Sequence, residues 1–231
     1  MTRRNAPKRL QRGLSIVEMM VGVTIGLIVV AAATLMVAGQ LADNRRLLLE
    51  TQIQQDMRTT ADLITRDLRR AGFWQHSPRG TVSGSGTGML VNPYTEVLPA
   101  NDADTDTAVT YRYAHPNRPV DDNIVNDDEV YGFRLRNGVI ESQLGRGNWQ
   151  ALTDAGALKV TRFQVTASHQ AVPLTCFRAC GPGATVCPPV QTVRAYTVEI
   201  EGEAANDATV ARSVRSHVRL RNDLVVGECR D

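Results

Sequence analysis

The stretch from Met19 to Gly39 contains no charged residue. A helix rises about 1.5 Å per residue, so this stretch is long enough to cross the roughly 30 Å hydrocarbon core of a bilayer. The thirteen residues before Leu14 carry five basic side chains and no acidic one. Lys and Arg beside a membrane segment resist translocation, so we expect this end in the cytoplasm and the chain after about residue 42 outside it.

Glu18 lies inside the apolar run that begins at Leu14. An ionised carboxylate in the apolar phase is expensive, and such a residue is usually functional. In an ordinary secretory signal the cleavage site follows the apolar region. Here the only obvious processing point, Gly13, precedes that region. Cleavage there would therefore leave the apolar helix on the mature protein.

This arrangement resembles the signal of type IV prepilins, over the stretch Arg12-Gly13-Leu14-Ser15-Ile16-Val17-Glu18-Met19-Met20. In that family, prepilin peptidase cuts after the glycine and methylates the new amino terminus. The resemblance implies cleavage between Gly13 and Leu14, methylation of Leu14, and Glu18 as the glutamate at the fifth mature position. Leu14 stands where the family most often has phenylalanine.

The resemblance also implies a role for the Glu18 carboxylate. In the family this glutamate is understood to pair with the amino terminus of a neighbouring subunit when helices pack side by side. The new amino terminus at Leu14 is also one helical turn from Glu18, which makes a pair within one chain possible. The alternative is a glutamate that stays near the lipid headgroups.

The apolar helix is predicted to continue well beyond the membrane. Residues 41–71 contain neither proline nor glycine, and helix-forming residues dominate. Apolar residues recur there at spacings of three and four, which indicates one buried stripe: Leu49, Ile53, Met57, Ala61, Ile64 and Leu68. Gly72 is a plausible stop. The helix from Leu14 would then be on the order of 90 Å long if unbroken.

The rest of the chain is rich in strand signals. A loop at 74–99, rich in Gly, Ser and Pro, precedes alternating apolar residues from Ala108 onward. The dipeptide Asn137-Gly138 between two apolar runs predicts a hairpin. Further strand candidates cover 158–167, 192–201 and 210–220. We therefore predict an α+β fold, in which one long helix packs on an antiparallel sheet.

The predicted organisation has four parts. They are a leader at 1–13, the membrane-spanning part of the helix at 14–42, its amphipathic continuation at 43–72, and a periplasmic β-rich domain at 73–231.

The four cysteines are candidates for disulfide bonds: Cys176, Cys180, Cys187 and Cys229. An even count in an exported domain favours disulfides, and four cysteines allow three pairings. A bond between Cys187 and Cys229 would tie the tail to the domain. A zinc site is the rival reading, but the spacing is not the usual paired Cys-x2-Cys and no histidine lies near.

A calcium loop is a weaker candidate. Three aspartates alternate along the chain, and alternate carboxylates can surround a hard cation: Asp102, Asp104 and Asp106. An EF-hand would need Gly at position 107 and Glu at position 113, where this chain has Thr107 and Tyr113. The cluster at 127–129 offers further oxygen ligands. A solvated acidic loop fits the pattern better.

Charge and motifs argue against several function classes. The whole chain carries a net charge of +2, and removal of the five basic residues of the leader leaves −3. That balance gives no basic footprint for nucleic acid. The four histidines are scattered, and no hydrolase or metalloprotease motif occurs. We therefore expect no enzymatic activity, no cofactor and no nucleic-acid partner.

The resemblance extends into the later chain. Residues 66–73, 106–111 and 218–222 are similar to PilW-type minor pilins and to their J-type pseudopilin relatives. The resemblance implies a minor pilin of a type IV pilus, anchored in the inner membrane with its domain in the periplasm. It also implies a place in the tip complex that starts pilus assembly. Its partners would be prepilin peptidase, other minor pilins, the major pilin and a candidate tip adhesin. The alternatives are a J-type pseudopilin of type II secretion and a membrane-tethered adhesin that does not polymerise.

Overall fold

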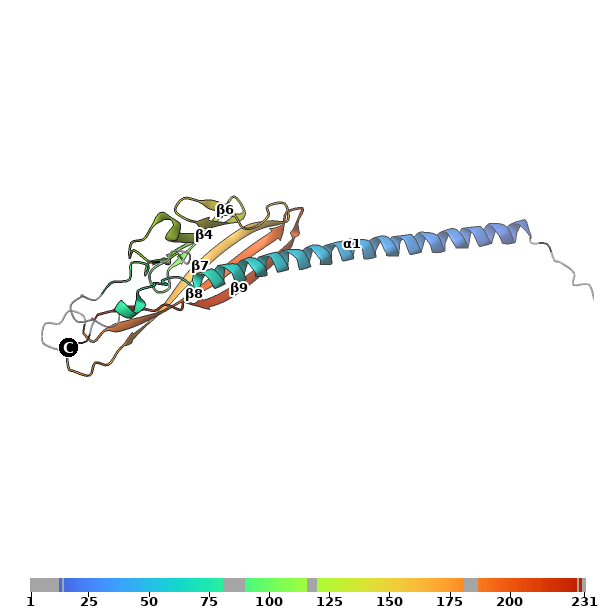
Figure 1. Ribbon diagram of the computed structural model, residues 1–231. Helices are drawn as coiled ribbons and strands as arrows, with labels where there is room; N and C mark the ends of the chain where they lie inside the picture. Colours follow the sequence, from blue (N-terminus) through green and yellow to red (C-terminus); the bar gives the residue numbers. More distant parts are fainter. Residues whose placement is uncertain are drawn as a thin grey trace, which may run out of the picture. The chain divides into compact units, whose positions relative to one another are not determined.

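A computed structural model describes residues 13, 15–80, 90–115, 120–180, 187–227 and 229. The chain divides into two compact units, Met1–Leu48 and Leu49–Asp231. One helix, α1 (Ile16–Leu68), is continuous through both. It is the blue-to-cyan helix of Figure 1. The single uninterrupted helix predicted from the sequence is confirmed within the described residues, and Leu14 lies outside them.

In the first unit, every side chain of α1 from Ile16 to Leu48 is exposed. By length and composition, this helix could cross a membrane. No residue of its most apolar 18-residue stretch is buried. A signal sequence near the amino terminus would pass the same test. The helix runs through Gly22, Gly26 and Gly39 without interruption.

In the second unit, α1 buries the stripe that the spacing predicts. Ile53, Met57, Ala61, Ile64 and Leu68 are each at most 1% exposed, and Leu49 is partly buried against them. The helix ends at Leu68, and the chain turns at Gly72, whose φ is +76°. This left-handed conformation favours glycine, which explains the predicted stop.

The predicted α+β fold with antiparallel strands is confirmed, and the strands are divided between two five-stranded sheets where one sheet was expected. The first has the order β1-β3-β4-β5-β6, and all its pairs are antiparallel. Its strands are β1 (Val97–Leu98), β3 (Ala108–Arg112), β4 (Val130–Arg136), β5 (Val139–Leu144) and β6 (Trp149–Ala151). The predicted hairpin is confirmed, because β4 and β5 join through Asn137 and Gly138, both with positive φ.

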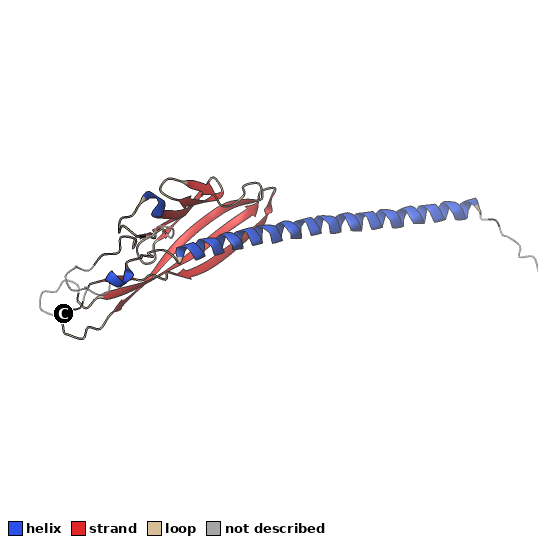
Figure 2. Ribbon diagram, in the orientation of Figure 1, coloured by secondary structure: helices blue, strands red, loops and turns tan. Residues whose placement is uncertain are grey.

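The second sheet contains the longest strands. It has the order β10-β8-β7-β2, with β9 also paired to β8. Its strands are β2 (Thr105–Asp106), β7 (Leu158–Pro173), β8 (Val190–Ala204), β9 (Asp207–Arg219) and β10 (Leu224–Val226). Figure 2 shows these strands beside the helix. The strand candidates at 158–167, 192–201 and 210–220 are confirmed and extend further than predicted.

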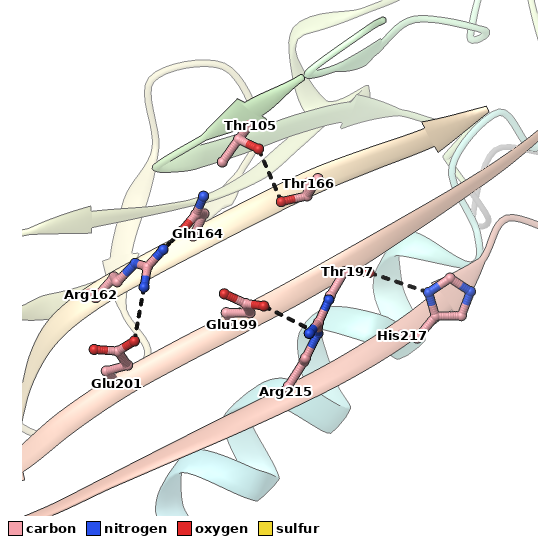
Figure 3. A network of polar contacts seen from close by, with 9 residues as sticks. All are labelled: Thr105, Arg162, Gln164, Thr166, Thr197, Glu199, Glu201, Arg215 and His217. Carbon is pink, nitrogen blue, oxygen red and sulfur yellow. Dashed lines mark hydrogen bonds and ion pairs between the residues drawn. The ribbon is translucent and has the colours of Figure 1, made fainter. Parts of the chain in front are cut away.

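One core joins the helix stripe to both sheets. Along β8 the buried residues alternate, with Tyr196, Val198 and Ile200 fully buried. The residues between them face the other side, where ion pairs join Arg162 to Glu201 and Arg215 to Glu199. Figure 3 shows this polar network on the face turned away from α1. The alternation thus separates a core face from a solvated face.

Two short 3-10 helices, η1 (Ser77–Gly80) and η2 (Asp127–Glu129), lie in the connections. Trp74, Tyr94 and Ala114 form a second, smaller core. The glycine-rich run at 84–88 within the predicted loop lies outside the described residues.

Candidate processing and assembly site

The predicted cleavage point lies just before the helix. Gly13 is exposed and outside any helix or strand, and a Cβ built on it would meet nothing within 4 Å. The carbonyl of Ser15 accepts the first backbone hydrogen bond of α1, from the Met19 amide at 3.0 Å. Leu14 and the leader at 1–12 lie outside the described residues. The bond after Gly13 is therefore next to an exposed residue that no helical hydrogen bond holds.

Glu18 lies in the first turn of α1 and is exposed. A carboxylate there is stabilised by the positive end of the helix dipole. It is the only ionisable side chain between Ile16 and Ala42. No ion pair joins it to another described residue. The position leaves the carboxylate available to a cationic partner.

The polar side chains further along the membrane segment are satisfied by the helix itself. The Thr24 hydroxyl donates to the carbonyls of Met20 at 3.0 Å and Val21 at 2.9 Å. The Thr34 hydroxyl donates to the Ala31 carbonyl at 2.8 Å. Such bonds let threonine sit in lipid without a water partner. Glu18 differs from both, because a carboxylate has no proton to donate and carries a charge.

All four cysteines are paired in two disulfides. Cys176 bonds to Cys229, and Cys180 bonds to Cys187. The expectation of disulfides is thus confirmed, but the tail is tied to the domain through Cys176 and not through Cys187. The sulfurs of Cys176, Cys180 and Cys187 lie within 4.8 Å of one another, so the two bonds are neighbours.

The three alternating aspartates hold separate turns. Asp102 accepts a hydrogen bond from the His169 amide at 2.7 Å, Asp104 accepts one from the Asn101 side-chain amide at 2.8 Å, and Asp106 accepts one from the Thr107 amide at 2.6 Å. Within the described ranges, the one group of three potential metal ligands is the disulfide-bonded cysteines. Calcium binding by these aspartates stays a prediction.

A buried arginine that the sequence did not predict holds the segment after the end of the helix. Arg194 is 4% exposed and donates to the carbonyls of Thr95 and Asn222. Asn222 in turn donates to the Ala71 carbonyl at 3.0 Å. Burial lowers the pKa of Arg194, an effect opposed by the nearby Tyr196 and Asp223. The signal was available, because the period-two pattern of β8 places position 194 on the same face as Tyr196.

Comparison with protein families gave two matches. Residues 46–220 match the family described as prepilin peptidase-dependent protein B. Residues 8–34 match the prokaryotic N-terminal methylation motif, which covers Gly13, Leu14 and Glu18. No curated protein and no solved structure matched the chain.

Proposed function

This chain belongs to the prepilin peptidase-dependent protein B family, and from that premise we propose that it is a minor pilin of a type IV pilus. The family and the methylation motif make it a type IV pilin-like protein. The apolar helix and the motif also indicate a membrane anchor with the C-terminal domain outside the membrane. The proposal adds a single pass through the inner membrane, a periplasmic domain, and a place in the complex that starts pilus assembly.

One observation carries this proposal. Within the segment that matches the methylation motif, an exposed Gly13 precedes the helix and Glu18 is the one charged residue of its apolar half. Cleavage after Gly13 would remove all five basic leader residues and create an amino group at Leu14. An amine and a carboxylate in an apolar phase stabilise each other, because each neutralises the charge of the other.

The geometry favours a partner supplied by another subunit. The apolar side chains of α1 from Ile16 to Leu47 are exposed in this chain, and a large exposed apolar surface indicates a lipid or protein partner. Packing against other minor pilins and the major pilin would cover this surface. In such packing, the Glu18 carboxylate would meet the amino terminus of a neighbour.

The amino terminus of the mature protein is the first test. We expect mass spectrometry of the protein from the native membrane to find a chain that begins with N-methylated Leu14. A chain that retains Met1 in working pili would refute processing and would favour a simple membrane-tethered adhesin.

A matched pair of variants tests the Glu18 pairing. We expect Glu18→Val to keep membrane insertion and cleavage but to lower recovery in sheared pili severalfold, because the partner of the amine is lost. Thr24→Val removes another polar group from the same apolar segment and should leave recovery unchanged. Equal recovery of the two variants would remove the pairing hypothesis.

The J-type pseudopilin reading is the alternative with the same anchor and fold. It is distinguished by phenotype, because loss of the gene would then stop secretion of exported enzymes and leave pili intact. A minor pilin predicts the reverse outcome.

A further inference from the structure

Three strand ends meet at one place in the second sheet. β7 ends at Pro173, β8 begins at Val190 and β10 ends at Val226. Val190 pairs with Pro173 on one side and with Val226 on the other. The Leu174 amide continues the first pairing, because it donates to the Pro189 carbonyl at 2.8 Å. The chain segments just beyond these three ends are therefore brought together.

The four cysteines lie in these segments. Cys176 follows the end of β7, Cys187 precedes the start of β8, and Cys229 follows the end of β10. Cys176 is bonded to Cys229, and Cys180 is bonded to Cys187. The Sγ atoms of Cys176, Cys180 and Cys187 nevertheless all lie within 4.8 Å of one another. Cys176 thus has two further sulfurs close by besides the one to which it is bonded.

The four cysteines differ in their access to solvent. Cys229 is exposed, whereas Cys176, Cys180 and Cys187 are half-buried. Disulfide exchange begins when an outside thiolate attacks one sulfur of the bond, and access helps to decide which sulfur is attacked. Attack at Cys229 forms a bond between the outside sulfur and Cys229. The bond to Cys176 breaks, and its electron pair leaves with the Cys176 sulfur. A thiolate is thereby released beside the second disulfide.

The released Cys176 thiolate has a target within reach. Reacting atoms need a separation of about 3–3.5 Å, and the Cys176 sulfur starts no more than 4.8 Å from those of Cys180 and Cys187. Its attack forms a bond to one of these two sulfurs and breaks the Cys180–Cys187 bond. The other sulfur leaves as a thiolate and takes up a proton. One thiol is consumed and one thiol appears, so the sequence needs neither an oxidant nor a reductant.

We propose that the four cysteines form an exchange relay, in which Cys176 changes its partner from Cys229 to Cys180 or Cys187 and leaves Cys229 joined to a small outside thiol. Once Cys176 is bonded elsewhere, its sulfur no longer attacks the new bond at Cys229. The tail beyond β10 is then no longer tied covalently to the domain. The relay depends on the positions of the sulfurs and not on the proposed role in the pilus.

Peptide mapping after treatment with glutathione tests the relay. Trypsin cleaves after Arg178, so Cys176 falls in peptide 163–178, Cys180 and Cys187 fall in 179–194, and Cys229 falls in 222–230. The full chain in detergent micelles is treated with reduced glutathione, trapped with N-ethylmaleimide and digested at mildly acidic pH for mass spectrometry. We expect glutathione on 222–230, a disulfide between 163–178 and 179–194, and one N-ethylmaleimide group on 179–194.

The double variant Cys180→Ser with Cys187→Ser is the matched control. It keeps the bond that is attacked at Cys229 and removes the sulfurs that accept Cys176. N-ethylmaleimide labelling of 163–178 should therefore rise severalfold over the wild type.

The peptide map of the wild type decides the proposal even if the double variant does not fold. The relay is overturned if chains with glutathione on Cys229 carry N-ethylmaleimide on Cys176 and keep the other disulfide. It is also overturned if glutathione attaches first to Cys180 or Cys187. The same holds if both disulfides of the folded chain resist a thiol concentration that opens them in urea, because Cys229 would then not be accessible.

Discussion

The two disulfides close loops of very different length, so their removal should destabilise the domain by different amounts. Cys176 and Cys229 are 53 residues apart, whereas Cys180 and Cys187 are 7 apart. The matched perturbations are the double variants Cys176→Ser with Cys229→Ser, and Cys180→Ser with Cys187→Ser. Each removes one bond and leaves the other in place.

The expected magnitudes follow from the entropy of loop closure in the unfolded chain. For a loop of 53 residues the bond contributes about 4 kcal/mol at 25 °C, and for a loop of 7 residues about 2 kcal/mol. The 7-residue loop lies inside the 53-residue loop. While both bonds are present, the Cys180–Cys187 bond removes 7 residues from the effective length of the longer loop. Because the dependence is logarithmic, this changes the larger value by only about 0.1 kcal/mol.

Urea denaturation of the full chain in micelles measures both losses. The two tryptophans, Trp74 and Trp149, lie in the second unit, so their fluorescence reports on unfolding of that unit. With an m-value of about 2 kcal/mol/M, the midpoints should fall by roughly 2 M and 1 M. Equal shifts, or a larger shift for the short loop, would refute the loop-entropy reasoning and place the effect in native contacts around the bonds.

Two further predictions concern the segments around Arg194. Gly72→Ala should lower the unfolding free energy by about 1–3 kcal/mol, because alanine would have to adopt the positive φ of Gly72 and its Cβ would lie 3.3 Å from Arg194 and Asn222. The same urea assay measures this loss. Gly147→Ala is the control, because position 147 shares the positive φ but has open space around it. Burial, followed by the nearby Arg194 charge, lowers the pKa of His169, so the unfolded chain binds the proton more readily. Stability should therefore fall as pH drops below about 6.5, and His169→Gln should flatten that slope in urea titrations from pH 7.5 to 5.

Long periodic segments were predictable because one period persists over many residues. The stripe from Ile53 to Leu68 and the alternation in β7 to β9 each repeat several times, so the buried face can be read directly from the sequence. The Asn137-Gly138 hairpin was predictable because a two-residue turn needs residues that tolerate positive φ. The short strands β1, β2, β6 and β10 have two or three residues and therefore carry no period.

Features that depend on long-range packing were not predictable in the same way. The division of the strands into two sheets depends on pairings such as β2 with β7, about 60 residues apart in the chain. The cysteine pairing could not be chosen among three connectivities without the positions of the chain ends. The membrane limit at residue 42 stays a prediction, because the boundary between compact units after Leu48 measures contacts and not membrane depth.

The burial of Asp121 and Glu129 shows that spacing along the chain is a poor guide to which carboxylates meet in space. The alternating aspartates 102, 104 and 106 look more like a ligand set, yet each accepts a hydrogen bond from a different amide. In loop 121–129 the outer carboxylates are exposed, and only the first and last residues turn inward toward Tyr94. Alternation describes spacing along the chain, whereas coordination needs oxygens that converge in space.

Fold stability and assembly depend on different parts of α1. From Ile53 onward the apolar stripe is buried in the domain core, so substitutions there should unfold the domain. From Ile16 to Leu47 every described side chain is exposed, so the substitution of Glu18 removes no buried contact of the domain core. A variant such as Glu18→Val should therefore leave the urea midpoint unchanged while it lowers incorporation into pili. If Glu18→Val instead shifted the midpoint, the loss of incorporation would no longer be evidence for pairing between subunits.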